Sequence, residues 1–244
     1  AYTLFALIAI AFCMVLIATF TFATDVALAA DESGEITEEI PVAIVTTNDT
    51  EITYATFAEA VQNATSGSTI KLLDNGNFCN IKNKTIAINL NGKTLSFDSG
   101  SSGNIQVTYS AVTIFDDSDT GTGCITGFQI AATSATVTIN SGNIDVQMYV
   151  KDTTLNVNGG RIRRLMCNTG SFLLSGGIIN SFYYYQGRHF FKGGKIGRIE
   201  NGSFDEILCE GYAYQKEDGS ALIKLSDMDY NTSVNIVECT HDSF

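Results

Sequence analysis

Between residues 136 and 201 the chain repeats one short pattern of hydrophobic and polar positions four times. A glycine closes each copy, and successive glycines stand 18, 17 and 17 residues apart: Gly142, Gly160, Gly177 and Gly194. An isoleucine follows two residues after each glycine: Ile144, Ile162, Ile179 and Ile196. The positions on either side alternate between apolar and polar, which is typical of strands with one buried face. Each repeat is therefore expected to hold strands around a corner.

A repeat of this size cannot bury its apolar side alone, so successive repeats must stack. The expected fold class is all-β, a single-stranded parallel β-helix, or β-solenoid, with right-handed turns. The four isoleucines would form one interior stack, each contributing about 1.5–3 kcal/mol on burial. Paired small residues such as Gly159-Gly160 fit a corner that the next repeat approaches closely.

Near residues 56–65 the spacing of apolar residues changes to that of a helix. Thr56 and Glu59 stand at the spacing of a capping box, and Gly67 lies beyond the expected end. A helix here would cap the first repeat, whose strand edge would otherwise be unpaired. Phe57 would anchor its buried face.

The first 24 residues carry no charge, and the apolar run Tyr2–Ala23 is long enough to span a bilayer. Residues 1–30 are expected to be a signal peptide or a retained membrane anchor, helical in either case. The A-x-A sequence Ala27-Leu28-Ala29, followed by Ala30, fits a signal-peptidase site and favours cleavage near Ala29. Because neither an initiator Met nor an early basic residue is present, the sequence is expected to be a fragment.

Three further segments complete the expected organisation. Residues 31–41 are expected to be an acidic linker, residues 42–240 the β-helix domain, and residues 241–244 the start of a truncated C-terminal region. Strands are expected near 41–45 and 234–237. Cys239 and His241 could open a zinc ribbon, but two ligands do not make a zinc site.

Composition narrows the choice of partners. The chain has 244 residues with 22 glycines and one proline, which suits a repetitive β architecture. Its net charge of −12 repels nucleic acid and anionic membranes, so neither is expected to bind the folded surface. The chain is expected to contact a membrane only through residues 2–23, if these are not cleaved. The six cysteines include no close pairs, so small buried wall residues are expected rather than a disulfide framework.

Five segments carry a family resemblance: Thr53–Val61, Gly67–Leu73, Ile88–Leu95, Val112–Gly127 and Glu210–Gly219. They resemble secreted β-helix repeat proteins common in Firmicutes, which are similar to the pectin-lyase-like right-handed β-helix superfamily. The resemblance implies the fold and an extracellular location. It implies no particular chemistry, because most such proteins have no assigned activity.

Asp116, Asp117 and Asp119 form the one acidic cluster. Polygalacturonase-like hydrolases of this superfamily use paired aspartates for acid/base chemistry. The neighbours of this cluster are turn formers, however, and the Gly-His-Gly and Arg-x-Lys elements of those hydrolases are missing. We therefore expect a loop with no catalytic residue, no cofactor and no metal. Calcium held by the three aspartates is the alternative.

Two features suggest a binding surface. Arg161, Arg163 and Arg164 form the most basic spot, and Tyr183 and Tyr185 belong to the most aromatic run. Exposed tyrosines on neighbouring repeats could stack against sugar rings. The alternative is that alternate tyrosines pack inside the wall while the arginines keep an exposed face soluble.

Counting from the corner glycines aligns aromatic and sulfur-containing residues of three repeats. This count places Met148, Met166 and Tyr183 in one stack. It places Tyr149, Cys167 and Tyr184 in a second stack.

These observations favour a non-catalytic β-helix module of a larger protein, secreted or on the cell surface. It would act as a stalk, a scaffold or a segment that contacts glycans or host-surface components. The alternative is a carbohydrate-active enzyme, a polysaccharide lyase or hydrolase of the pectin-lyase-like type. Acidic and basic side chains converging in a cleft would favour the enzyme.

Overall fold

The structure is a computed structural model of the chain, and it describes residues 29–30, 36–37, 40–97, 104–201, 211–224, 227–228 and 232–238. Two compact units, Ala1–Ile40 and Pro41–Phe244, make up the chain. In the first unit, β1 (Ala29–Ala30) pairs antiparallel with β2 (Ile36–Thr37), so a short strand lies within the expected linker.

The expected leader helix, Tyr2–Ala23, lies outside the described residues. Within the part of the chain that is described, no helix is both long and apolar enough to cross a membrane.

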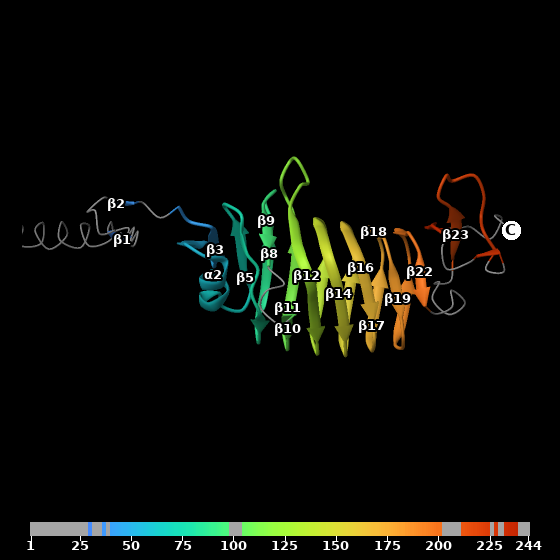
Figure 1. Cartoon of the computed structure of the whole chain (residues 1–244), viewed down its shortest axis with the longest axis horizontal. Helices are drawn as coiled ribbons and strands as arrows, with labels where there is room; N and C mark the ends of the chain where they lie inside the picture. Colours follow the sequence, from blue (N-terminus) through green and yellow to red (C-terminus); the bar gives the residue numbers. More distant parts are fainter. Residues whose placement is uncertain are drawn as a thin grey trace, which may run out of the picture. The chain divides into compact units, whose positions relative to one another are not determined.

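The second unit is built mostly of β-strands, which the chain adds to two long sheets in turn (Figure 1). The first sheet has nine strands: β3 (Ala43–Thr47), β4 (Thr50–Tyr54), β5 (Ser68–Leu72), β8 (Thr85–Asn89), β11 (Ala111–Phe115), β13 (Thr136–Ile139), β15 (Thr153–Val157), β17 (Gly170–Leu174) and β20 (Arg188–Phe191).

The second sheet has thirteen strands: β6 (Gly76–Asn77), β7 (Ile81–Lys82), β9 (Thr94–Ser96), β10 (Ile105–Thr108), β12 (Cys124–Thr133), β14 (Asn143–Lys151), β16 (Arg161–Cys167), β18 (Ile178–Ile179), β19 (Phe182–Tyr184), β21 (Lys195–Ile196), β22 (Ile199–Asn201), β23 (Tyr212–Lys216) and β24 (Val234–Glu238). The two sheets share one hydrophobic core, to which both contribute the buried residues of each alternating strand. We call them the nine-stranded and the thirteen-stranded sheet.

The predicted isoleucine stack is confirmed. Ile144 pairs with Ile162, Ile162 with Ile179 and Ile179 with Ile196, all in parallel register. All four side chains are fully buried. Neighbouring strands from β5 through β22 are parallel in both sheets. This arrangement is compatible with the β-solenoid expected from the repeat.

A single helix of the described residues, α2 (Phe57–Asn63), forms where the helical spacing places it. Its capping box is complete, since the Glu59 backbone N–H donates to the Thr56 hydroxyl and the Thr56 N–H donates to the Glu59 carboxylate, both at 3.1 Å. Phe57 is buried, and the helix packs against β3, β4, β5 and β6.

At each end of the parallel stack, antiparallel strands extend one of the two sheets, which the repeat did not predict. At the first end, β3 pairs antiparallel with both β5 and β4. At the last end, β24 pairs antiparallel with both β21 and β23. Strands do occur near the expected segments 41–45 and 234–237. β3 and β24 each pair with the last parallel strand of their sheet, β5 and β21. These pairs cover strand edges that would otherwise expose unpaired backbone groups.

Candidate functional site

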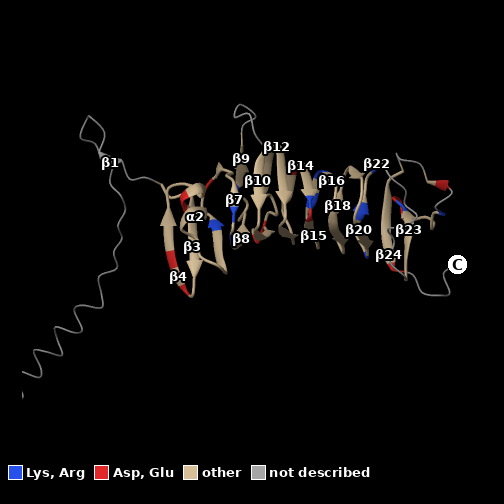
Figure 2. Ribbon diagram, turned by 90° about the horizontal axis from the view of Figure 1, so that it is seen from below, with Lys and Arg blue, Asp and Glu red and all other residues tan. Residues whose placement is uncertain are grey.

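All five predicted binding residues belong to the outward side of the thirteen-stranded sheet. Arg161, Arg163 and Arg164 lie on β16, where the intervening Ile162 and Leu165 are fully buried. Tyr183 lies on β19, and Tyr185 follows that strand directly. Figure 2 shows the basic segment of β16 in blue near the middle of the sheet. The fold therefore brings the basic and aromatic groups to one sheet.

The aromatic stacks predicted by counting from the glycines are wrong by one residue between β14 and β16. Met148 pairs with Leu165, and Tyr149 pairs with Met166, which in turn pairs with Tyr183. The cause is a register shift between Ile144 and Gln147, where β14 accommodates one extra residue. The part of the count that joins β16 to β19 is correct.

The result is an outward column of Tyr149, Met166 and Tyr183, with Tyr185 beside it. The rings of Tyr183 and Tyr185 lie 4.8 Å apart between centroids and are tilted by 49°. A hydrogen bond with Tyr183 and the proximity of its phenol raise the pKa of Tyr185 above its usual value. Tyr185 is half exposed. We call Tyr149, Tyr183 and Tyr185 the tyrosine cluster.

The alternate residues of the same aromatic run pack toward the core, as expected from the alternative in which alternate aromatic residues lie inside the wall. Phe182 is fully buried against Phe172, with ring centroids 5.5 Å apart. Tyr184 packs edge-on against His189, with centroids 4.4 Å apart. One run of four residues thus supplies both core packing and an outward aromatic surface.

Two of the three predicted arginines are engaged in ion pairs within the chain. Arg163 pairs with Asp145 at 3.7 Å on the exposed surface. Arg164 pairs with Glu200, whose carboxylate also accepts hydrogen bonds at 2.5 Å from Arg198 and from the Ser181 hydroxyl.

This network controls the ionisation of Glu200. Burial raises the pKa of Glu200, but the Ser181 hydrogen bond and the two guanidinium groups outweigh burial and lower the pKa below its usual value. The role of Arg164 is therefore structural to a large extent, because its charge balances a partly buried carboxylate.

Arg161 differs from its two neighbours. Its Nε donates to the Asn180 side-chain oxygen at 3.1 Å, and no carboxylate of the described residues forms an ion pair with it. It lines a groove of about 370 Å³ on the outer side of the thirteen-stranded sheet. The other lining residues are Ile178, Asn180, Lys195, Gly197, Arg198, Glu217 and Ser233. We call this the basic groove.

Sequence reasoning missed Lys195 and Arg198, although a signal for Lys195 was available. Lys195 is the first residue after the corner glycine Gly194, as Arg161 is after Gly160. The two residues therefore occupy the same register position, with Ile178 between them.

The acidic cluster is a corner loop between β11 and β12. One Asp116 carboxylate oxygen accepts the Gly92 N–H at 2.8 Å, and the other accepts the Gly123 N–H at 2.7 Å. The Asp116 backbone also exchanges hydrogen bonds with the Ser141 hydroxyl. Burial raises the pKa of Asp116, but the hydrogen bonds from Gly92, Gly123 and Ser118 outweigh burial, so the net pKa lies below the usual aspartate value. Asp116 therefore ties three successive repeats together.

Asp116→Asn is expected to lower the free energy of unfolding by about 1–3 kcal/mol, because an amide cannot accept at both positions and leaves a backbone donor without a partner. The contribution of Asp116 should persist above the usual aspartate pKa and disappear as the pH falls through its lowered folded pKa. Urea unfolding at pH 7 would measure the loss. Asp117→Asn is the matched control, since Asp117 is exposed; equal effects of the two substitutions would contradict the corner role.

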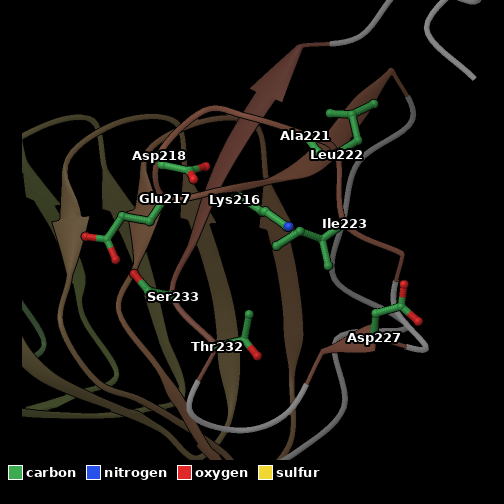
Figure 3. Close-up of a pocket in the computed structure, with 9 residues that line it drawn as sticks. All are labelled: Lys216, Glu217, Asp218, Ala221, Leu222, Ile223, Asp227, Thr232 and Ser233. Carbon is green, nitrogen blue, oxygen red and sulfur yellow. The ribbon is translucent and has the colours of Figure 1, made fainter.

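A pocket with a volume of about 770 Å³ lies beside strands β23 and β24. In Figure 3 the carboxylates of Glu217, Asp218 and Asp227 point in different directions around it. Acid/base hydrolysis requires two carboxyl groups facing one bond. This pocket does not present that arrangement among the described residues.

Cys79, Cys124 and Cys167 are free thiols. Cys167 is buried in the sheet wall, and burial raises the pKa of its thiol. Burial also raises the pKa of Cys79 to about 11. These groups are therefore protonated at neutral pH and act as small apolar residues, whereas Cys209 lies outside the described residues.

Comparison of the chain with protein-family models, with curated proteins and with solved structures finds no significant match.

Proposed function

We propose that residues 42–240 form a right-handed β-solenoid of the kind found in secreted β-helix repeat proteins, with α2 and the first hairpin covering its N-terminal end. Parallel pairing at the repeat length supports this proposal. So does the alternate use of the two sheets by successive strands. Such stacks are stiff, extended supports, because each repeat buries its apolar side against its neighbours.

The function that this architecture supports best is a non-catalytic module, secreted or at the cell surface, that acts as a scaffold and contacts glycans. The observation that carries it is the tyrosine cluster, which places aromatic rings on the outside of a stiff sheet. Phenol rings stack on the apolar faces of sugar rings while their hydroxyls stay hydrated. The ring of Tyr185 is half exposed, and the ring contact that it makes is with Tyr183 of the same cluster.

A polysaccharide lyase or hydrolase is the second candidate, and the geometry favours it less. Asp116 uses both carboxylate oxygens for backbone hydrogen bonds, so it is poorly placed to exchange protons with a substrate. It lies in a corner loop, whereas Arg161, Arg163 and Arg164 lie on a strand two repeats later. These acidic and basic groups do not line a common pocket among those described.

Glycan binding should depend on Tyr183. We expect the protein to bind neutral polysaccharides such as xylan or glucomannan weakly, and Tyr183→Ala to weaken binding about three- to tenfold through loss of one stacked ring. Affinity electrophoresis in gels that contain each polysaccharide would measure this. Tyr109→Ala is the control, since Tyr109 is an exposed tyrosine outside the cluster.

The same protein should release no reducing ends and no unsaturated products from pectins, alginates or host glycans. Turnover that is abolished by Asp117→Asn would establish the enzyme instead. Absence of binding to every glycan would refute the contact role while leaving the scaffold role in place.

A further inference from the structure

We infer that the basic groove binds the carboxylate or sulfate groups of an anionic polysaccharide. This deepens the proposed glycan-contact function and rests on it for the type of polymer. The groove lies before the register shift of the thirteen-stranded sheet, whereas the tyrosine cluster lies after it. The two surfaces can therefore be tested separately.

Three cationic groups line the groove from two repeats. Arg161 and Lys195 occupy one register position two strands apart, which corresponds to about 10 Å along the stack. Arg198 lies on the same side as Lys195, across the small residue Gly197. Cations that recur at this interval match charges carried on alternate rings of an extended sugar chain better than they match a single small anion.

Arg161 is the group best prepared to receive an anion. The hydrogen bond from its Nε to Asn180 orients the guanidinium, and among the described residues no ion pair engages its terminal nitrogens. A guanidinium presents these donors in the fork geometry that suits carboxylate, sulfate and phosphate oxygens. Arg161 is also exposed, so an anion can reach it from solvent.

The local charge opposes that of the whole protein. Around the groove and the adjoining β16 surface, Arg161, Arg163, Arg164, Lys195 and Arg198 face the carboxylates of Asp145, Glu200 and Glu217. Five positive and three negative groups leave a local charge of about +2 on a chain of net charge −12. A positive patch on a chain of negative net charge attracts anions to this place.

The floor and rim of the groove favour a sugar over a bare ion. Ile178 forms an apolar floor and is 39% exposed, which is unusual for isoleucine and leaves a surface for a ring face. Asn180 and Ser233 add polar groups that can bond to hydroxyls. The net charge of −12 on the whole chain disfavours a nucleic acid, whose densely spaced phosphates would extend beyond the patch.

The test measures affinity of the whole chain for dextran sulfate, polygalacturonate, neutral dextran and a single-stranded oligonucleotide at two salt concentrations. We expect both anionic polysaccharides to bind more tightly than dextran, with binding that weakens as salt rises. Comparison of the two distinguishes a sulfate from a carboxylate preference. Arg161→Gln should weaken anionic binding at least tenfold, and Arg161→Lys should recover only part of it, because the fork is lost.

Arg188→Gln is the matched control, since Arg188 is an exposed arginine on the nine-stranded sheet. Equal losses in the Arg161 and Arg188 variants, or tightest binding to the oligonucleotide, would overturn the assignment. Thermal unfolding of each variant separates misfolding from lost contacts. Tyr183→Ala should leave the Arg161-dependent part of binding intact, so loss of neutral-glycan binding and loss of anion binding report on the two proposals independently.

Discussion

Gly159→Ala is expected to destabilise the protein strongly, and more than Gly219→Ala. A Cβ built at Gly159 would lie 2.2 Å from the carbonyl oxygen of Asn140 in the preceding repeat. The clash is with backbone atoms of Asn140, and the Asn158 and Gly159 N–H groups donate to the Ile139 carbonyl nearby. The two corners therefore cannot move apart without breaking these hydrogen bonds. We expect a loss of about 3 kcal/mol or more in the free energy of unfolding, measured by urea denaturation.

Gly219→Ala provides the control for this prediction. Gly219 has a φ of +74°, but no atom of the described residues lies within 4 Å of an added Cβ. Alanine there pays only for the left-handed backbone, about 1–2 kcal/mol. Gly159 has the close approach without the positive φ. If Gly219→Ala proved the more damaging change, close packing between repeats would not be the reason for the small residues at the corners.

The corner and the isoleucine stack could be predicted because they recur. A period of 17 or 18 residues repeats the same requirements at the same place, so Gly160 and Gly177, or Ile162 and Ile179, support one another as evidence. The capping box of α2 was equally accessible, since Thr56 and Glu59 make a local interaction with a fixed spacing.

Features that occur once were beyond the reach of the repeat. The register shift after Ile144 changes which residues of β14 and β16 pair with each other. The first repeat is one residue longer than the next, but its length alone does not show where the extra residue lies. The antiparallel direction of β3 and β24 depends on hairpins at the two ends. A pattern of buried and exposed positions is the same for a strand that runs in either direction.

The candidate site was predicted by residue type but not by partner. Arg164 and Glu200 are 36 residues apart, and they meet because β22 lies two strands away from β16. Glu200 is the extra residue of a register shift in which Phe182 pairs with Ile199 and Tyr183 pairs with Asn201. Without these contacts, three arginines in four residues look equivalent. With them, Arg161 alone keeps a guanidinium that no carboxylate of the described residues engages.

His189 should make the stability of the protein depend on pH between about 6.5 and 4, a range that begins above the titration of the carboxylates. It continues the apolar column of Phe172 on β17 and is 6% exposed. Burial lowers the pKa of His189 to about 4, although a hydrogen bond with the Gly187 backbone opposes this shift. Between about pH 6.5 and 4 the unfolded chain therefore binds more protons at this site than the folded chain does.

Stability should accordingly fall as the pH decreases from about 6.5 and level off, for this group, below about 4. The shift corresponds to at most about 3 kcal/mol, and solvent near the edge strand β20 reduces the expected loss to about 1–2 kcal/mol. His189→Phe extends the aromatic column with a side chain that cannot be protonated, so the fall between pH 6.5 and 4 should largely vanish in this variant. Urea unfolding at half-unit pH steps gives the difference between the two proteins, in which the carboxylates common to both cancel. Parallel curves for the two proteins would show that His189 is hydrated or charged in the folded state, and that the neutral, core-facing imidazole inferred here is wrong.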